Sequence, residues 1–339
     1  MTIDYIMFIT FLLIFNIFVI FNFKRISKTI NLYDIPDTVR KIHDNPVPLI
    51  GGFIIFINTL FFITFFFIYE SNFLLKYFYF TELKPFIYFL LFLVLIFLIG
   101  LYDDKYNLGA LSRLVMISFL IYFYLKVDNT SIIHQLNFSF TGHQINFEIG
   151  SIIFTSICLI ILLISCNMFD GINLQSFLFY IINFSFLYYM HSNFYLLVLI
   201  FSIFIFGILN FNGKIFLGDS GVYILSLILG IFYIKYYNFM PGRIEADIIF
   251  SILLLPVLDA GRCIVHRIIN GKNPFAGDRN HFHYLLLKKY SYTKTILLIS
   301  ALILVPIINY FLNVNTFYGI SLVLFIYFYL YFFKLSKFL

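Results

Sequence analysis

Residues 85–104 read PFIYFLLFLVLIFLIGLYDD, an apolar run that ends in two adjacent carboxylates. A helix needs about 20 mostly apolar residues to cross the hydrocarbon core of a bilayer, and this run is long enough. Asp103 and Asp104 then lie where the helix leaves the membrane. Carboxylates are costly beside a bilayer and usually serve a function there. The stretch therefore predicts a membrane-spanning helix with a polar site at its end.

The whole chain has the composition of a polytopic membrane protein. Of its 339 residues, 62% are hydrophobic and 11% are charged, whereas soluble domains carry about 25% charged residues. We expect an all-α membrane protein that forms one domain over residues 1–339. Eleven apolar segments qualify as spans, at about 4–23, 49–69, 85–102, 110–126, 150–167, 173–190, 193–211, 218–235, 246–267, 295–312 and 316–333.

The sequence also predicts a turn between the last two spans and a β-hairpin in one of the loops. The last two spans come from one uncharged stretch, and the asparagines around Asn313 indicate that the chain turns back there. Residues 136–149 alternate apolar and polar side chains around Gly142, a pattern typical of a small β-hairpin outside the membrane.

The distribution of Lys and Arg sets the orientation. Most of them fall in alternate loops, which predicts an outside N-terminus and a cytoplasmic C-terminus. All the polar motifs described below then face the cytoplasm, and the hairpin lies on the periplasmic side. Nucleic-acid binding is not expected, because the basic residues are spread over short loops rather than one face. The three cysteines show neither metal-binding spacing nor a disulfide framework.

The first motif is the Asp103-Asp104 pair itself. Adjacent carboxylates suit a site for Mg²⁺ and phosphate, or one can act as a base while the other orients. The structural alternative is a solvated loop after a helix. Arg113 follows on the next helix, where it could meet a phosphate.

The second and third motifs also lie at ends of spans. Asn167 and Asp170 are three residues apart and share one face of a helix end, with Gly171 allowing a turn. Asp219 stands near the start of a later span, where it could hold a divalent metal. Capping of helix ends is the structural alternative for both motifs, and for the second motif in isolation it is the favoured one.

The fourth motif is the loop 271–284, which contains Arg279, His281 and His283. A guanidinium and two imidazoles suit phosphate recognition and the neutralisation of charge on a leaving group. A His-X-His pair can also bind a metal, but the carboxylate and amide oxygens elsewhere favour a hard cation. His43 precedes a Pro- and Gly-rich segment, 46–52, that predicts a tightly packed start of the second span.

In order and spacing, from Leu32 to about Leu287, these motifs resemble the polyprenyl-phosphate N-acetylhexosamine-1-phosphate transferases of glycosyltransferase family 4. The loop from Pro274 to His283 is most similar to the bacterial branch that begins O-antigen, enterobacterial common antigen or wall teichoic acid. The resemblance implies transfer of a sugar 1-phosphate from a UDP-sugar, by default UDP-GlcNAc, to undecaprenyl phosphate. It implies Mg²⁺ or Mn²⁺ as cofactor, UMP as product and a bacterial inner membrane location, and it allows a homodimer.

The resemblance also assigns roles by position. The residues predicted as catalytic are Asp103, Asp104 and Asp170, and the predicted metal ligands are Asn167 and Asp219. The residues predicted to bind substrate are Arg279, His281 and His283 by their match to the loop motif, together with Arg113 and His43 from the sequence itself.

Three positions depart from the family pattern. Val222 replaces a serine after the third motif, Tyr284 replaces the last histidine of the loop motif, and Asn173 follows the second motif in place of the usual aspartate. We therefore keep a UDP-N-acetyl deoxy-sugar (QuiNAc or FucNAc) as an alternative donor. From other classes, a membrane transporter and an inactive scaffold of the same fold remain as alternatives.

Overall fold

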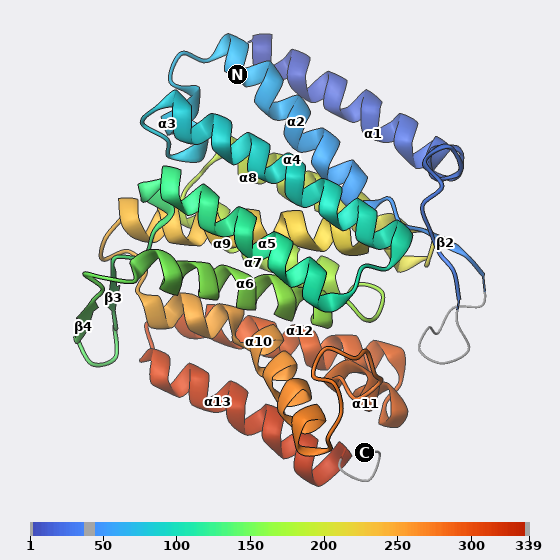
Figure 1. Cartoon of the computed structure of the whole chain (residues 1–339), viewed down its shortest axis with the longest axis vertical. Coiled ribbons are helices and arrows are strands. Elements are labelled where there is room, and N and C mark those ends of the chain that lie inside the picture. The colour runs from blue at the N-terminus through green and yellow to red at the C-terminus, as the bar shows by residue number, and fades with distance from the viewer. Residues whose placement is uncertain (1–2, 37–44, 336–339) are drawn as a thin grey trace.

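The computed structural model describes residues 3–36 and 45–335 of the chain, which form a bundle of helices (Figure 1). The helices are α1 (Ile3–Ile30), α2 (Gly51–Tyr69), α3 (Phe73–Phe78), α4 (Leu83–Tyr106), α5 (Ala110–Val127), α6 (Ser151–Phe169), α7 (Gln175–Met190), α8 (Phe194–Phe211), α9 (Gly218–Phe239), α10 (Ala246–Ile269), α11 (Phe282–Lys289), α12 (Tyr292–Phe311) and α13 (Thr316–Tyr329). The short elements are β1 (Tyr33–Asp34), β2 (Val47–Pro48), β3 (Gln135–Asn137), β4 (Gln144–Asn146), η1 (Asn129–Ser131) and η2 (Leu330–Leu335).

Every one of the eleven predicted spans coincides with a helix. In the described part of the chain, nine helices are long and apolar enough to cross a membrane by length and composition, namely α1, α2, α4, α5, α6, α8, α9, α10 and α12. The remaining two predicted spans correspond to α7 and α13, which are shorter. The all-α polytopic fold is confirmed, while full crossing by α7 and α13 stays a prediction.

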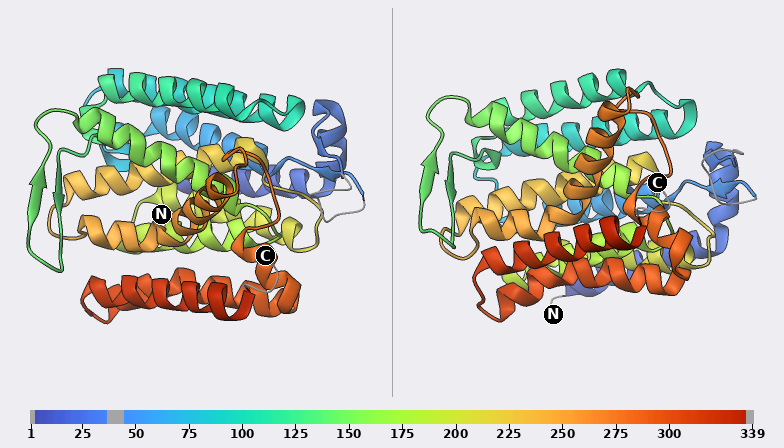
Figure 2. Two further views of the ribbon diagram at one scale, coloured as in Figure 1. Left: turned by 60° about the horizontal axis from the view of Figure 1, so that its bottom comes forward. Right: turned by 90° about the horizontal axis from the view of Figure 1, so that it is seen from below.

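The predicted turn and hairpin are both present. Helix α12 ends at Phe311 and α13 begins at Thr316; between them Asn313 takes a left-handed conformation, with φ of 53°. Strands β3 and β4 pair in antiparallel fashion with Leu136 opposite Ile145. The hairpin connects the end of α5 to the start of α6, and Figure 2 shows it projecting beyond one end of the bundle.

Helix α9 is the centre of the bundle. Nearly all its residues are buried, and it packs against α2, α4, α6 and α7. A helix that is apolar all round belongs in such a position. Helix α9 begins at Gly218, and its N-terminus lies at the end of the bundle opposite the hairpin. There it contacts the last turn of α4.

Glycines let α2 and α4 reach the first turn of α9. A Cβ added at Gly52 would lie 2.3 Å from the backbone nitrogen of Gly221, and one at Gly100 would lie 2.3 Å from Cα of Ser220. Small residues at such contacts allow the close backbone packing on which membrane helices depend. The start of α2 is also tied by backbone hydrogen bonds from Gly51 to Phe216 (3.0 Å) and from Gly52 to Leu217 (2.9 Å). The tightly packed start predicted for this span is confirmed.

Helix α10 changes direction along its length. Pro256 lies inside it and removes one backbone hydrogen-bond donor, which is a common cause of a kink. Figure 1 shows the C-terminal part of α10 running at an angle to its first part, toward α11 and α13. The kink carries the residues after Pro256 to the same end of the bundle as the N-terminus of α9.

Substitution of Gly100 by Ala should destabilise the protein, because the added methyl group would force α4 away from α9. Overpacking of this kind costs about 1–3 kcal/mol. Gly261→Ala is the matched control, since Gly261 is also helical and a Cβ there would meet nothing within 4 Å. Thermal unfolding in detergent should show a lower Tm for Gly100→Ala only. An equal Tm for the two variants would contradict the close packing.

Candidate active site

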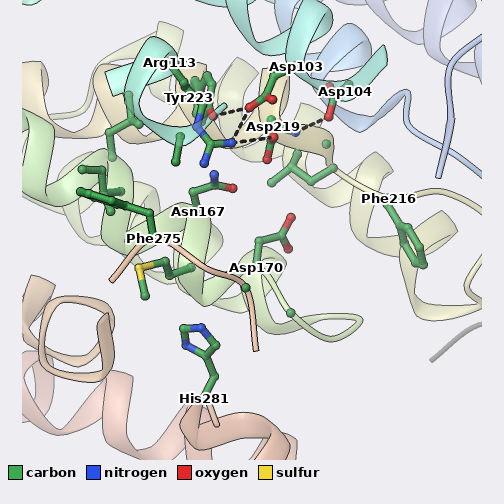
Figure 3. Close-up of a pocket in the computed structure, with 18 of the residues that line it drawn as sticks. Asp103, Asp104, Arg113, Asn167, Asp170, Phe216, Asp219, Tyr223, Phe275 and His281 are labelled. Atoms are coloured by element: carbon green, nitrogen blue, oxygen red, sulfur yellow. Dashed lines mark hydrogen bonds and ion pairs between the residues drawn. The ribbon is translucent and has the colours of Figure 1, made fainter. Parts of the chain in front are cut away.

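A cavity of about 790 Å³ opens at the end of the bundle opposite the hairpin. Its wall is built from the ends of α4, α5, α6 and α9 and from the loop between α10 and α11 (Figure 3). The volume falls within the range of ligand-binding sites, about 300–1,000 Å³. Among the predicted site residues that the structure describes, all but Arg279 line this cavity: Asp103, Asp104, Arg113, Asn167, Asp170, Asp219, His281 and His283.

Asp103 is buried and fully engaged. Its Oδ1 accepts a hydrogen bond from the Leu108 amide (2.8 Å). Its Oδ2 accepts one from the Tyr223 hydroxyl (2.9 Å) and pairs with the Arg113 guanidinium. The same Arg113 nitrogen lies 3.4 Å from Oδ2 of Asp219, so one cation bridges the carboxylates of two helices.

Asp104 caps the N-terminus of α9. Its Oδ1 accepts from the Asp219 amide (2.7 Å), and its Oδ2 accepts from the amide (3.2 Å) and the hydroxyl (2.8 Å) of Ser220. The first amides of a helix lack partners within the helix, and a carboxylate is a favourable acceptor for them. The capping alternative considered for Asp219 is therefore wrong: Asp104 is the cap, which leaves the Asp219 carboxylate to face the cavity (Figure 3).

Asn167 and Asp170 point into the cavity from the end of α6 (Figure 3). Among the described residues, no side chain or backbone group forms a hydrogen bond with the Asn167 amide that would compete with a ligand. Asp170 accepts a hydrogen bond from the Ser176 hydroxyl (2.7 Å) and remains partly accessible from the cavity. Burial among protein atoms raises the pKa of Asp170 to about 6, and Asp34 across the cavity contributes to this shift.

His281 belongs to the loop that closes the cavity from the other side. The side chain is buried. Its Nδ1 lies 3.0 Å from Oδ2 of Asp259 in α10, and its Nε2 lies 3.3 Å from Nη2 of Arg267. Histidine is thus held on both ring nitrogens in this structure.

His283 packs directly on the second motif. A Cβ added at Gly171 would lie 1.9 Å from its Nε2, so this position requires glycine. Its Nδ1 is 3.3 Å from the Gln175 amide, and in the described part of the chain the buried Nε2 has no hydrogen-bond partner. Burial lowers the pKa of His283 to about 3, so the ring is neutral near pH 7. A neutral ring can recognise a phosphate only through a single N–H group.

Arg267, in the last turn of α10 before the loop, lines the cavity, whereas Arg279 of the loop does not. Arg279 is exposed and is not one of the described residues that line the cavity, so its contact with substrate stays a prediction. Arg267 is buried and lines the cavity, where Asp278 accepts a hydrogen bond from its Nε (2.9 Å). His43 lies outside the described residues.

Sequence reasoning assigned no role to two residues of the site. Tyr223 was overlooked although it follows Asp219 by four residues and therefore shares its helix face. Arg267 stands at the end of the predicted span 246–267, and nothing in the sequence indicates what it contacts. The first could have been found from helical spacing, whereas the second needed the conformation of the loop.

The donor groups fit a hard divalent cation. Carboxylate and amide oxygens from Asp219 and Asn167 face the same cavity as Asp170 (Figure 3). Oxygen ligands of this kind are the ones that Mg²⁺ and Mn²⁺ prefer, and Mg²⁺ sites typically combine one or two carboxylates with substrate phosphates.

Comparison with known proteins points the same way. The family model "Glycosyl transferase family 4" matches residues 86–237, which include Asp103, Asn167 and Asp219. The chain is also 27% identical over 280 residues to the undecaprenyl-phosphate alpha-N-acetylglucosaminyl 1-phosphate transferase of Thermotoga maritima, a match that covers 81% of this chain and 79% of that protein. The motifs, the membrane fold and both matches agree in the similarity of this chain to glycosyl transferase family 4.

Proposed function

We propose that this protein transfers N-acetylhexosamine 1-phosphate from a UDP-sugar to undecaprenyl phosphate and releases UMP. The observation that carries the proposal is the cavity at one end of a membrane bundle, where carboxylates from three helices meet two arginines. UDP-GlcNAc is the donor we favour, because the Thermotoga maritima relative is named for transfer of N-acetylglucosaminyl 1-phosphate to undecaprenyl phosphate. The product would begin a lipid-linked cell-surface glycan of the O-antigen, common-antigen or teichoic-acid type.

The position of the cavity suits two substrates that arrive from different phases. A lipid phosphate with a long apolar tail must approach within the bilayer, whereas a nucleotide sugar approaches from water. A site at the end of the helices is open to both. The bias of Lys and Arg toward this end supports a cytoplasmic active site in the inner membrane of a bacterium.

For the chemical step we favour direct attack over the alternative route, in which an Asp nucleophile forms a covalent phospho-sugar enzyme. An oxygen of the lipid phosphate attacks the phosphorus that carries the sugar, and the bond from that phosphorus to the bridging oxygen breaks. The electron pair leaves with UMP. The lipid phosphate is already an anion near neutral pH. Both oxygens of Asp103 already accept hydrogen bonds, which favours an orienting role over nucleophilic attack by this residue.

Asn167 and Asp219 are the residues we assign to the metal. When bound there, Mg²⁺ or Mn²⁺ would offset the charge of the diphosphate and of the departing UMP. Arg113 lies beside both carboxylates and would orient a phosphate oxygen. Asp170, which faces the same space, would act as a base or orient the attacking phosphate.

A deoxy-sugar donor (QuiNAc or FucNAc) is the second candidate. The observation in its favour is that two positions that depart from the family pattern, Asn173 and Tyr284, both line the cavity. Transport is disfavoured, because transporter sites lie near the bilayer midplane between paired broken helices. An inactive scaffold is disfavoured by the complete set of acidic residues around the cavity.

The proposal is tested by UMP release from the detergent-purified protein with undecaprenyl phosphate, Mg²⁺ and a panel of UDP-N-acetyl sugars. We expect release that requires the lipid, one sugar and the metal, and that stops when EDTA is added. Release with a deoxy-sugar but not with UDP-GlcNAc would establish the second candidate. No release with any sugar from folded protein would overturn the transferase assignment, and uptake of substrate into vesicles would then support transport.

Variants of two neighbouring carboxylates should separate the metal site from the helix cap. Asp104→Ala removes the cap of α9, so we expect both lost activity and a lower Tm, at a cost of about 0.5–2 kcal/mol. Asp219→Ala and Asn167→Ala should abolish UMP release with a smaller fall in Tm than Asp104→Ala, since Asp219 loses a contact of 3.4 Å with Arg113 but no helix cap. Full activity in either of these two would remove the metal assignment, and an equal fall in Tm for all three would contradict the cap.

Asp170 should link activity to pH and stability. The folded protein keeps the Asp170 proton up to about pH 6, whereas the unfolded chain loses it near pH 3.8, so this group lowers stability as pH rises between these values. We therefore expect Asp170→Asn to melt at a higher temperature than wild type, by a margin larger at pH 7.5 than at pH 4.5. The variant should lose at least about 100-fold in kcat/KM. Wild-type activity should fall as pH drops through about 6. Retained activity in Asp170→Asn would contradict a catalytic role.

A further inference from the structure

One carboxylate outside the predicted motifs organises the loop between α10 and α11. Asp259 of α10 is buried, and its Oδ1 accepts three hydrogen bonds, from Arg262 Nη2 (2.7 Å), the Tyr327 hydroxyl (2.8 Å) and the Phe282 amide (3.1 Å). Its Oδ2 faces Nδ1 of His281 at 3.0 Å. Oδ1 therefore joins α10 to α11 and α13, whereas Oδ2 orients the His281 ring.

The contacts of His281 fix where its proton lies. A carboxylate only accepts hydrogen bonds, so Nδ1 must carry the proton toward Asp259. A guanidinium only donates, so the lone pair of Nε2 must accept from Arg267 Nη2 at 3.3 Å. The histidine is then the neutral tautomer that is protonated on Nδ1. Each partner of the ring is satisfied in this tautomer alone.

Arg267 is the last residue in the series of contacts that runs from Asp259 through His281. Besides His281, its guanidinium donates to Asp278 Oδ2 (2.9 Å) and to the Pro274 carbonyl (2.9 Å). These bonds hold the planar group in the wall of the cavity, across from the carboxylates of α4 and α9. A guanidinium has five N–H donors, so two remain for a ligand.

We propose that Asp259 is a positioning residue that sets the tautomer of His281, and that this tautomer keeps Arg267 directed at the diphosphate of the nucleotide sugar. The inference rests on the proposed function for the identity of the ligand. Residues that orient the groups in contact with a ligand in this way often matter nearly as much as those groups themselves.

A metal ion held by Asp259, Cys263 and His281 is the competing interpretation. Single ligand atoms of these residues lie within 4.8 Å of one another. However, Arg262 Nη2 lies 2.7 Å from Asp259 Oδ1 and 3.2 Å from Cys263 Sγ. A fixed guanidinium thus already supplies the positive charge of this cluster, which favours the hydrogen-bonded network.

The variant Asp259→Asn tests the tautomer directly. Three donors surround Oδ1, so the amide oxygen of the new asparagine would stay on that side and its NH₂ group would face His281. Nδ1 would then have to accept, and the proton would move to Nε2. A donor at Nε2 would repel Arg267 from its position in the cavity wall. The variant preserves shape and most bracing contacts while reversing one hydrogen bond.

We expect Asp259→Asn to lower kcat for UMP release at least about 30-fold. The KM for the UDP-sugar should change by less than about threefold, because the cation matters most when charge develops on the leaving phosphate. The matched control is Asp247→Asn, since Asp247 is also buried on α10 but accepts hydrogen bonds from Ser139 at the hairpin end. Tyr327→Phe removes one brace from Oδ1 without touching the histidine side. Both controls should keep kcat within about twofold of wild type; a loss like that of Asp259→Asn in Tyr327→Phe would indicate a purely structural role.

A double-mutant cycle gives a second readout. In a His281→Ala background no tautomer remains to be set, so adding Asp259→Asn should change kcat by less than about threefold. Residues that act through each other show this lack of additivity. Multiplication of the two single effects would overturn the proposal.

The tautomer can also be measured without any activity. In protein labelled with ¹⁵N-histidine, the His281 signals, assigned by their loss in His281→Ala, should show Nδ1 protonated in wild type and Nε2 protonated in Asp259→Asn. Wild-type His281 that is charged, or protonated on Nε2, would refute the inference even if Asp259→Asn does not fold. If no sugar supports UMP release, the proposed function fails while this measurement still decides the tautomer.

Discussion

The bond between the Asp104 carboxylate and the first amides of α9 is the contact on which the rest of the site depends. It joins the last turn of one membrane helix to the first turn of another, so the residues next to it on each helix are placed together. Asp103 precedes the cap, and Asp219 supplies one of the capped amides. The positive end of the α9 dipole and the negative charge of Asp104 stabilise each other in this arrangement. The glycines Gly52 and Gly100 make the approach possible, because no larger residue would fit between the backbones.

This arrangement gathers more negative charge than the local cations can balance. Four carboxylates line the cavity near the ends of α4, α6 and α9, and Arg113 is shared between two of them. Like charges in a partly buried space repel each other, so the folded protein bears an electrostatic cost at this end. A divalent cation and the arginines of the site would relieve that cost when a diphosphate is bound. The same imbalance explains why removal of the Asp219 carboxylate is expected to cost less stability than removal of the capping Asp104.

The sequence predicted the spans and the motifs well, because hydropathy and local order are properties of short segments. The approach of the four motifs at one end followed from the topology of the spans, and the cavity confirms it for every motif that the structure describes. The sequence could not predict that Asp103 pairs with Arg113 while Asp104 caps α9, since the roles of two adjacent carboxylates depend on where the partner helix lies. The place of Arg267 in the cavity wall could not be predicted for a similar reason. Arg267 lies in the last turn of α10 and Arg279 in the loop that follows, and only the folded structure shows that the first is buried and the second exposed.

The two walls of the cavity differ in how they are held, and this difference bears on how the site works. On one wall the charged groups stand on helix ends that are locked by backbone packing within the bundle. On the other wall Arg267 lies in the last turn of α10, and His281 stands at the end of the loop that follows. A catalytic group must be held within a fraction of an ångström to be effective. Asp259 holds the end of that loop in place through its contacts with Arg262 and the Phe282 amide. The kink at Pro256 brings Asp259 and Arg267 toward the loop, so that the last turns of a membrane helix form the wall of the cavity beside the loop.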